Sequence, residues 1–580
     1  MSGDQLAVLA EAPRPGIDSP RVDERRAREP SLTIGRVDTP GSGELPLPRA
    51  ELLQRLRETR RWDVVVIGGG ATGLGCAVDA ASRGLSTLLL ESRDFAAGTS
   101  SRSSKLIHGG LRYLAQGRIG LVHEALAERA RLLANAPHLV HPLRFVVPAA
   151  NFFQRLKLSV GVMAYHSLAG RHALGATSLL NARQAGSAVP NLNPAKGHSA
   201  VAYWDAQFDD ARLAIDLMKT VFDHGGLAIN AMPVVELLPA GGFGGAAADS
   251  SPQGDSLRLS QGDSLQSSQG DSLRSQKNGR IATLRARDAL SGEVFEFDAG
   301  VIINAAGVWA DRTRRLALPS APAMLSVSRG IHLVVDAEFL GGDDALVVPE
   351  TDDGRLLFVL PWHGKVLLGT TDTPCPAAED EPQPSPAEID YVLQTAAPYL
   401  KRAPQRSDIR AAFAGLRPLL RDLDRTSSAA AENTASLSRE HQVREAPEGV
   451  ISVVGGKWTT YRAMAEDAVD AALASAGLGQ HRCVTSHLPI HRSTRTWPDQ
   501  APGRAELAAL VDYAVRFEQA HSLDDVLARR SRLLLCDAAA AIELAAPVAE
   551  QLRQLNGQSA AWRDAELARF VALAQVYRGR

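Results

Sequence analysis

Residues Arg61–Glu91, RWDVVVIGGGATGLGCAVDAASRGLSTLLLE, decide the fold of this chain. They begin with the apolar, β-branched run Val64–Ile67, which is typical of a parallel strand buried on both faces. Three glycines follow in the spacing G-x-G-x-x-G. Gly68 permits a tight turn, Gly70 lets backbone approach a pyrophosphate, and Gly73 lets the next helix pack against the strand.

The residues after the glycines complete a dinucleotide-binding unit. A helix of small residues is expected over 71–81, and its N-terminus offers N–H groups and partial positive charge to a pyrophosphate. The apolar run Thr87–Leu90 predicts a second strand, and it ends at Glu91, eighteen residues past Gly73. A carboxylate there can accept both hydroxyls of an adenosine ribose. Because these features agree, an adenine dinucleotide is favoured over a glycine-rich turn without a ligand, but NAD and FAD are not yet distinguished.

Composition excludes several classes of protein. The chain has 580 residues with a net charge of −2, which gives no support to nucleic acid as a partner. No apolar run reaches the length of a membrane-spanning helix. The first residues lack the pattern of a secretory signal, and their acidic side chains argue against a mitochondrial presequence, so a cytoplasmic location is expected. Four scattered cysteines fit a reducing compartment and argue against a zinc site.

Two segments show no globular pattern. Residues 1–60 are expected to form a mobile tail that ends in a short charged helix over 51–60. QGDSL is repeated at residues 253, 261 and 269. The range 239–279 is therefore predicted to be a low-complexity loop between two strands of one hairpin, of a length that costs little free energy.

A hydroxyl-rich segment follows the dinucleotide unit. Its hydroxyls and glycines suit a loop that lies along a cofactor. The alternative is a polar loop followed by the solvated start of a helix. The candidate cofactor residues are Ser100, Ser101, Ser103, Ser104, Leu106 and His108.

From about Trp62 onward, the chain resembles the FAD-dependent, quinone-linked glycerol-3-phosphate dehydrogenases of respiratory chains. The first shared motif is SSKLIHGGLRYL (Ser103–Leu114). Later ones are FDDARL (Phe208–Leu213), NAAGVWAD (Asn304–Asp311), FVLPW and LLGTTD (Phe358–Asp372), GLRPL (Gly415–Leu419), SREH (Ser438–His441) and VVGGKWTTYR (Val453–Arg462).

The predicted fold class is α/β. An FAD-binding Rossmann-like domain is expected to carry an α+β substrate-capping domain and a C-terminal helical domain. The FAD-binding part is assigned to 61–317, with inserted helices over 120–200, and to 411–475. The cap is assigned to 318–410 and the helical domain to 494–580.

Two more segments are expected to meet the cofactor. Strands are expected over 293–297 and 300–303. The second of them leads through Asn304 into Ala306 and Gly307, and this second glycine contact favours FAD over NAD. The strand–glycine–helix pattern over 450–472 suits the N1/C2=O edge of a flavin, where negative charge develops on reduction. The alternative for its glycines is a helix cap alone. The candidates there are Gly456, Lys457, Thr459 and Thr460.

The resemblance implies oxidation of sn-glycerol 3-phosphate to dihydroxyacetone phosphate, with hydride passing to flavin N5 and electrons to membrane quinone. A phosphate dianion calls for arginine side chains. Arg112, Arg417 and Arg439 come from three segments, and Tyr113, Lys457 and Thr459 are further candidate contacts. His108 and His332 are both candidates for the proton acceptor.

One position departs from the family pattern. An arginine is expected three residues before Arg329, and Ser326 stands there. An oxygen-using glycerol-3-phosphate oxidase and an amine-oxidising relative share most of the motifs, although three arginines favour an anionic substrate. A non-catalytic FAD-binding redox sensor is the alternative from another class of protein.

The remaining predictions concern contact with a membrane, the oligomeric state and two sets of charged residues. Residues 151–174 are apolar and basic, which suits either a membrane interface or a half-buried helix. The resemblance implies a peripheral enzyme at the inner face of the cytoplasmic membrane, and a homodimer is possible. Asp209 or Asp210 is a candidate N-cap of a helix. Arg529, Arg530 and Arg532 are expected to form salt bridges on a solvated face.

Overall fold

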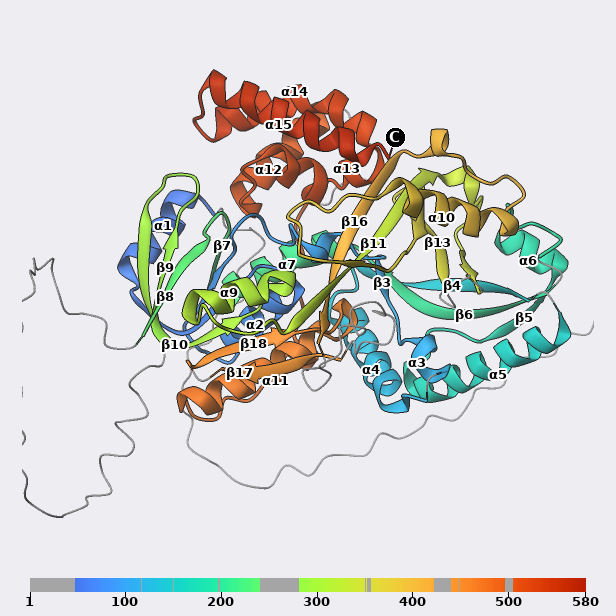
Figure 1. The fold of residues 1–580 in the computed structure, drawn as a ribbon, viewed down its shortest axis with the longest axis horizontal. Coiled ribbons are helices and arrows are strands. Elements are labelled where there is room, and N and C mark those ends of the chain that lie inside the picture. Colours follow the sequence, from blue (N-terminus) through green and yellow to red (C-terminus); the bar gives the residue numbers. More distant parts are fainter. Residues whose placement is uncertain are drawn as a thin grey trace, which may run out of the picture. The chain divides into compact units, whose positions relative to one another are not determined.

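Figure 1 shows the computed structural model of the chain. The structure describes residues 47–115, 117–149, 151–196, 199–239, 281–349, 351, 356–421, 440–446, 448–495 and 504–579. The predicted tail before residue 47 and the QGDSL repeats lie outside these residues.

An eight-stranded sheet is built around the Arg61–Glu91 unit. Its main path runs β17-β18-β10-β1-β2-β7, and the bonds among β18, β10, β1, β2 and β7 are parallel. The strands are β1 (Arg61–Ile67), β2 (Thr87–Leu90), β7 (Leu227–Ile229), β8 (Val234–Pro239), β9 (Ile281–Arg287), β10 (Val294–Asn304), β17 (Gln442–Glu445) and β18 (Val450–Val454). Val64, Val65 and Val66 are fully buried, as the uninterrupted apolar run predicts.

Helices cover both faces of this sheet. On one face α2 (Ala71–Ser82) packs between α11 (Tyr461–Ala476) and α7 (Asp210–Asp223). On the other face α1 (Arg49–Glu58) packs on apolar side chains of β1, β2 and β10. Asp209 is the N-cap of α7 and accepts the backbone N–H of Arg212 at 3.0 Å, which confirms one of the two candidates.

One strand differs from the prediction. Two strands were expected over 293–303, but β10 is continuous. Its first half pairs antiparallel with β9, and its second half pairs parallel with β1 and β18. The hairpin prediction is confirmed for the described residues, because β8 and β9 are antiparallel neighbours on either side of residues 240–280.

A second sheet has ten strands, in the order β15-β11-β14-β13-β12-β4-β6-β3, with β16 on β11 and β5 on β6. Its strands are β3 (Leu106–Ile107), β4 (Val140–Ala149), β5 (Ser178–Asn181), β6 (Ser199–Phe208), β11 (Leu325–Asp336), β12 (Ala345–Val348), β13 (Leu357–Trp362), β14 (Lys365–Gly369), β15 (Thr373–Cys375) and β16 (Ala411–Leu420). The helices beside it are α3 (Leu111–Ala115), α4 (Ile119–Asn135), α5 (Phe152–Ala169), α6 (Ala182–Ala188), α9 (Ala310–Ala317) and α10 (Pro386–Ala396).

The second sheet takes more of the chain than expected. Inserted helices were predicted over 120–200, and β4 and β5 also lie there and pair with β6. β16, assigned from the sequence to the FAD-binding part, pairs along its whole length with β11. These pairings join segments far apart in the sequence, so no local pattern indicates them.

The C-terminal helices lie over β16 (Figure 1). They are α12 (Arg504–Glu518), α13 (Leu533–Cys536), α14 (Ala538–Leu555) and α15 (Ala560–Tyr577), with a π-helical turn at Asp525–Arg530. The solvated face predicted for Arg529, Arg530 and Arg532 is wrong. All three are buried, although they do form salt bridges.

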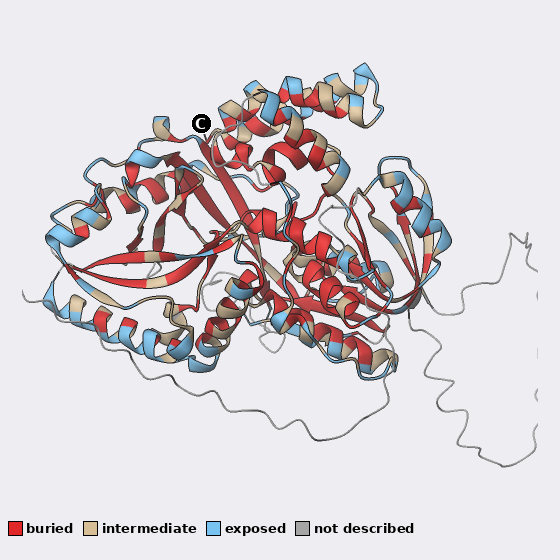
Figure 2. Ribbon diagram, turned by 180° about the vertical axis from the view of Figure 1, so that it is seen from behind, coloured by how far each residue is buried: buried red, intermediate tan, exposed pale blue. Residues whose placement is uncertain are grey.

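α5 has apolar side chains on two faces. Ser159, Val162, Tyr165 and Ala169 are buried against the protein. The opposite face carries Phe152, Phe153, Leu156, Val160 and Met163, each 51–80% exposed. Figure 2 shows pale blue, exposed residues along the outer side of this helix. Within the described part of the chain, no helix combines the length and hydropathy needed to cross a bilayer.

Candidate active site

A cavity of about 860 Å³ lies between the two sheets. Residues at the carboxyl ends of β1, β2, β10 and β18 line it, together with residues of β11 and β16. Its volume is in the range of ligand sites, and the carboxyl edge of a parallel sheet is where such folds bind nucleotides.

The glycine turn leaves room only for hydrogen. A Cβ on Gly73 would lie 1.8 Å from the carbonyl oxygen of Gly68, and a Cβ on Gly68 would lie 2.7 Å from that of Ala305. Gly68 has φ +112°, which also favours glycine. The turn and the start of α2 line the cavity through Gly68, Gly70 and Ala71. Gly73 does not line it, so its role is to let α2 approach the turn.

Glu91 is held at the cavity by the backbone. One carboxylate oxygen accepts the N–H of Gly69 at 2.6 Å, and the other accepts the N–H of Arg93 at 2.8 Å. The Ser92 hydroxyl also donates to the second of these oxygens, at 3.1 Å. The oxygen that accepts from Gly69 therefore keeps a lone pair for a ligand hydroxyl. The position agrees with the predicted ribose contact.

Side chains of the loop Ser92–Lys105 fix it to α2 and α7 by hydrogen bonds. The Ser100 hydroxyl accepts the N–H of Ala71 at 2.9 Å, and Ser103 donates to Asp210 at 2.7 Å. Lys105 is fully buried and donates to both oxygens of Asp210, at 2.7 and 2.8 Å. Of the predicted serines, Ser100, Ser103 and Ser104 line the cavity, whereas Ser101 does not.

A second glycine turn faces the first. Gly455 and Gly456 both have positive φ, and Gly456, Lys457 and Thr459 line the cavity, whereas Thr460 does not. The Lys457 ammonium lies 4.0 Å from the centre of the Tyr113 ring, a cation–π contact.

The Arg417 side chain, on β16, lies over Gly330 of the neighbouring strand β11. A Cβ on Gly330 would lie 2.1 Å from the Arg417 guanidinium, so the absence of a side chain there makes room for it. The guanidinium donates to the carbonyl of Thr371 at 2.9 Å and to the Thr370 hydroxyl at 3.1 Å. Together with the Asp372 carboxylate, which lies 3.5 Å from the guanidinium, these bonds hold it in a fixed orientation at the cavity wall.

His332 is buried at the same wall. Its Nε2 lies 2.8 Å from the Ser104 hydroxyl, and its ring stacks on Phe413. Burial, with the charges of Lys105 and Arg417, holds the pKa of His332 well below its usual value. The imidazole is therefore uncharged at neutral pH.

The cavity collects most of the predicted substrate residues. The side chains that line it are His108, Tyr113, His332, Arg417, Lys457 and Thr459. Arg112 lies in α3, but its side chain is outside what the structure describes, and Arg439 is outside the described residues altogether. Ser326 is not among the lining residues and accepts a bond from Arg421 at 3.1 Å.

Sequence reasoning missed a buried hydrogen-bond network that holds Gly109, the residue after His108. The N–H of Gly109 donates to the Tyr165 hydroxyl at 2.8 Å, Tyr165 donates to Asp205 at 2.9 Å, and Arg129 donates to Asp205 at 2.6 Å. This buried set comes from α4, α5 and β6, so only the three-dimensional arrangement reveals it.

Two family models match the chain. Residues 63–258 and 262–471 match the family described as FAD dependent oxidoreductase. Residues 484–564 match the C-terminal domain of alpha-glycerophosphate oxidase.

Curated relatives cover most of the chain. Mitochondrial glycerol-3-phosphate dehydrogenase of Macaca fascicularis is 38% identical over 451 residues, or 76% of this chain and 57% of that protein. The probable mitochondrial glycerol-3-phosphate dehydrogenase of Dictyostelium discoideum is 32% identical over 527 residues, or 82% of this chain and 78% of that protein. The chain thus spans little more than half the length of the mammalian relatives.

Solved structures share the fold. Glycerol-3-phosphate dehydrogenase of Bacillus halodurans, complexed with FAD, has a TM-score of 0.67 and 24% identity, with 91% of this chain and 97% of that chain covered. L-alpha-glycerophosphate oxidase of Mycoplasma pneumoniae has a TM-score of 0.51 and 17% identity, with 76% and 99% covered.

Proposed function

The chain belongs to the FAD-dependent glycerol-3-phosphate dehydrogenase family, and from this we propose that it oxidises sn-glycerol 3-phosphate to dihydroxyacetone phosphate. The cofactor is FAD. Its pyrophosphate fits the glycine turn, where a Cβ at Gly68 or Gly73 would collide with neighbouring backbone. When bound, FAD supplies the acceptor for the hydride of the substrate carbinol. The observation that carries the proposal is one cavity holding a fixed guanidinium, an uncharged imidazole and this turn.

The phosphate of the substrate is assigned to the cationic part of the cavity. Arg417 presents an oriented guanidinium, and Lys457 adds a second positive charge beside Tyr113. Thr459 supplies a hydroxyl in the same lining. Arg112 and Arg439 stay as predicted contacts, as the family resemblance implies.

The hydroxyl proton of the substrate is assigned to His332. An acceptor must be uncharged at working pH, and the lowered pKa of His332 meets that condition. Its bond to Ser104 fixes the ring beside the cofactor loop. His108 also lines the cavity and is the second candidate. Substituting each histidine by asparagine and comparing the loss of kcat would show which of the two accepts the proton.

An anaerobic titration tests the reaction. The purified protein is expected to be yellow, and the flavin absorption should bleach on addition of sn-glycerol 3-phosphate. A yellow protein that does not bleach contradicts the substrate and favours the redox-sensor alternative. Fast reoxidation of the bleached enzyme by oxygen favours the oxidase alternative, whereas slow reoxidation by oxygen and fast reoxidation by a quinone analogue support the dehydrogenase.

We also propose that α5 attaches the protein to a membrane surface. Its exposed apolar face includes two adjacent phenylalanines, and Lys157 is exposed on the same helix. An apolar face flanked by basic residues is suited to the boundary between headgroups and acyl chains. Quinone lies in the membrane, so this attachment would bring the enzyme to its acceptor. The cytoplasmic location and the homodimer stay predictions.

Phe152→Ser/Phe153→Ser should release the protein from lipid. Burying one phenylalanine contributes about 1.5–3 kcal/mol, so the double change should lower partitioning onto anionic vesicles by at least about 100-fold. Vesicle co-sedimentation measures it, and activity with a soluble dye acceptor should not change. Leu290→Ser/Val294→Ser removes two other exposed apolar side chains and is the matched control. Equal losses in both variants would contradict the assignment of α5.

A further inference from the structure

The C-terminal helical domain contacts the cofactor loop Ser92–Lys105 on the side that faces away from the cavity. Asp94 lies in this loop, is 2% exposed and is not part of the cavity lining. Its neighbours Arg93 and Ala96 do line the cavity. A group that fixes Asp94 therefore fixes the loop without touching the cofactor.

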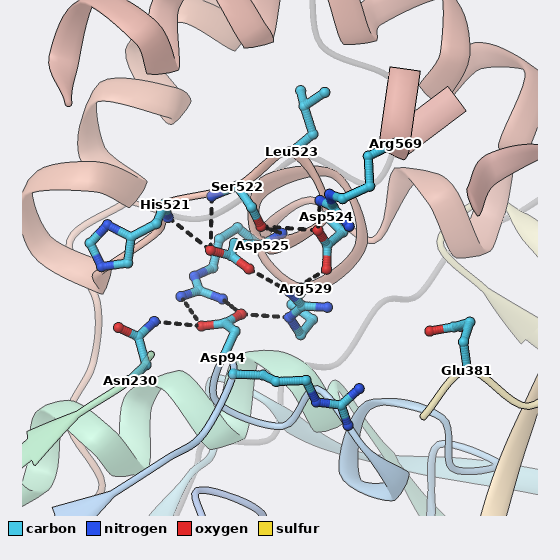
Figure 3. Close-up of polar contacts among 12 residues, drawn as sticks. Asp94, Asn230, Glu381, His521, Ser522, Leu523, Asp524, Asp525, Arg529 and Arg569 are labelled. Carbon is cyan, nitrogen blue, oxygen red and sulfur yellow. Dashed lines mark hydrogen bonds and ion pairs between the residues drawn. The ribbon is translucent and has the colours of Figure 1, made fainter. Parts of the chain in front are cut away.

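Four donors surround the Asp94 carboxylate. Oδ2 accepts from Arg529 at 2.5 Å and from Arg530 at 2.6 Å. Oδ1 accepts from Arg530 at 2.9 Å and from Asn230 at 3.0 Å. Figure 3 shows Asp94 below the turn that carries Arg529, with Asn230 at its other side. Burial alone would raise the pKa of Asp94, but the charges of Arg530 and Arg529 outweigh it and hold that pKa at about 2.

The arginines are themselves anchored within the C-terminal helices. Arg529 also pairs with Asp525 at 2.5 Å and with Asp524 at 2.9 Å, and Asp524 contacts Arg569 of α15. Arg530 donates to the backbone of Glu518 in α12 at 2.6 Å. Both guanidiniums are buried, so their geometry is set by these partners and not by solvent.

A second contact holds the other end of the loop. Arg102 lines the cavity and donates to Glu381 at 2.7 Å. Tyr577, the last residue of α15, donates to the other oxygen of Glu381 at 2.7 Å and is buried. The helical domain thus reaches the loop directly at Asp94 and, through Glu381, at Arg102.

We propose that Arg529, Arg530 and Tyr577 are positioning residues that hold the cofactor loop closed on FAD, so that the C-terminal helical domain controls how long FAD stays bound. Buried ion pairs are a weak source of net stability, but they impose one geometry, and removal of one partner leaves the other uncompensated. The proposal rests on FAD binding and not on the identity of the substrate, so it can fail while the substrate assignment holds.

Asp94→Asn tests the proposal in the holoenzyme. Free flavin fluorescence after dilution gives the rate of FAD release, which should rise at least tenfold. At saturating FAD, KM for sn-glycerol 3-phosphate and kcat should stay within twofold, because Asp94 does not line the cavity. A folded Asp94→Asn protein that releases FAD at the wild-type rate overturns the proposal.

Asp537→Ala is the control for loss of stability in the same helices. Asp537 caps α14 and accepts the N–H of Ala540 at 3.0 Å, away from the loop. This variant should lower Tm and leave FAD release within twofold. If it speeds release as much as Asp94→Asn does, general destabilisation explains the effect and the proposal is wrong.

Tyr577→Phe decides the question if Asp94→Asn does not fold. It removes one hydroxyl and keeps the ring, and loss of one hydrogen bond should speed FAD release by about two- to tenfold. Release at the wild-type rate in this folded variant counts against the proposal.

Discussion

Gly73→Ala is expected to purify without FAD and with a large loss of stability. The added Cβ would lie 1.8 Å from the carbonyl oxygen of Gly68, a backbone atom that cannot rotate away. Gly68 is itself held, because its N–H donates to Leu90 at 2.9 Å and its Cα side faces Ala305. We expect the free energy of unfolding to fall by about 3 kcal/mol or more, the upper end for overpacking, since α2 must move away from β1.

The ratio of flavin to protein absorbance and a thermal melt measure this effect. Gly186→Ala is the matched control, because nothing lies within 4 Å of its new Cβ and it sits in α6. That change should keep FAD at the wild-type level and stabilise the helix by up to about 1 kcal/mol. A yellow Gly73→Ala protein with wild-type Tm would contradict the role given to this turn.

The turn at Gly73 was predictable because its information is local. The strand, the glycine spacing and Glu91 lie within one stretch of 31 residues, Arg61–Glu91, and each has a physical reason that stands alone. The pairing of β4 with β6 was not predictable, since it depends on which distant strands find each other. The same holds for Arg529 and Arg530, whose partner Asp94 lies 435 and 436 residues away.

The site was predicted in part for a related reason. Family motifs contain Arg417 and Lys457, and His332 was one of two candidate proton acceptors. The structure places all three at one cavity. The buried support formed by Arg129, Tyr165 and Asp205 has no motif of its own. Ser326 was singled out by its departure from the family pattern, yet its side chain meets Arg421 and is not part of the cavity lining. Ser326 lies on the same face of β11 as Gly330 and His332 but farther along the strand, and the sequence alone does not say where along the strand the cavity ends.

Arg417→Ala should lower kcat/KM for sn-glycerol 3-phosphate by about 10²–10³-fold while FAD stays bound. Removing one partner of a charged hydrogen-bonded contact costs about 2–5 kcal/mol, and the guanidinium here is held by Thr370 and Thr371 at the cavity wall. Arg417→Lys keeps the charge but loses the planar fork, so an intermediate loss is expected. Steady-state kinetics with a soluble acceptor measure both.

Two comparisons separate phosphate binding from a structural role of Arg417. Arg421→Ala removes the next arginine along the chain, which is exposed, bonded to Ser326 and not among the cavity-lining residues, so its kinetics should stay within twofold of wild type. Glycerol, which lacks the phosphate, should be oxidised equally poorly by wild type and Arg417→Ala, so the preference for the phosphorylated substrate should shrink. If Arg417→Ala loses activity toward both substrates in the same proportion, the guanidinium supports the sheet and does not bind the anion. If instead Arg421→Ala shows the large loss, the anion site lies at the Ser326 end of β11.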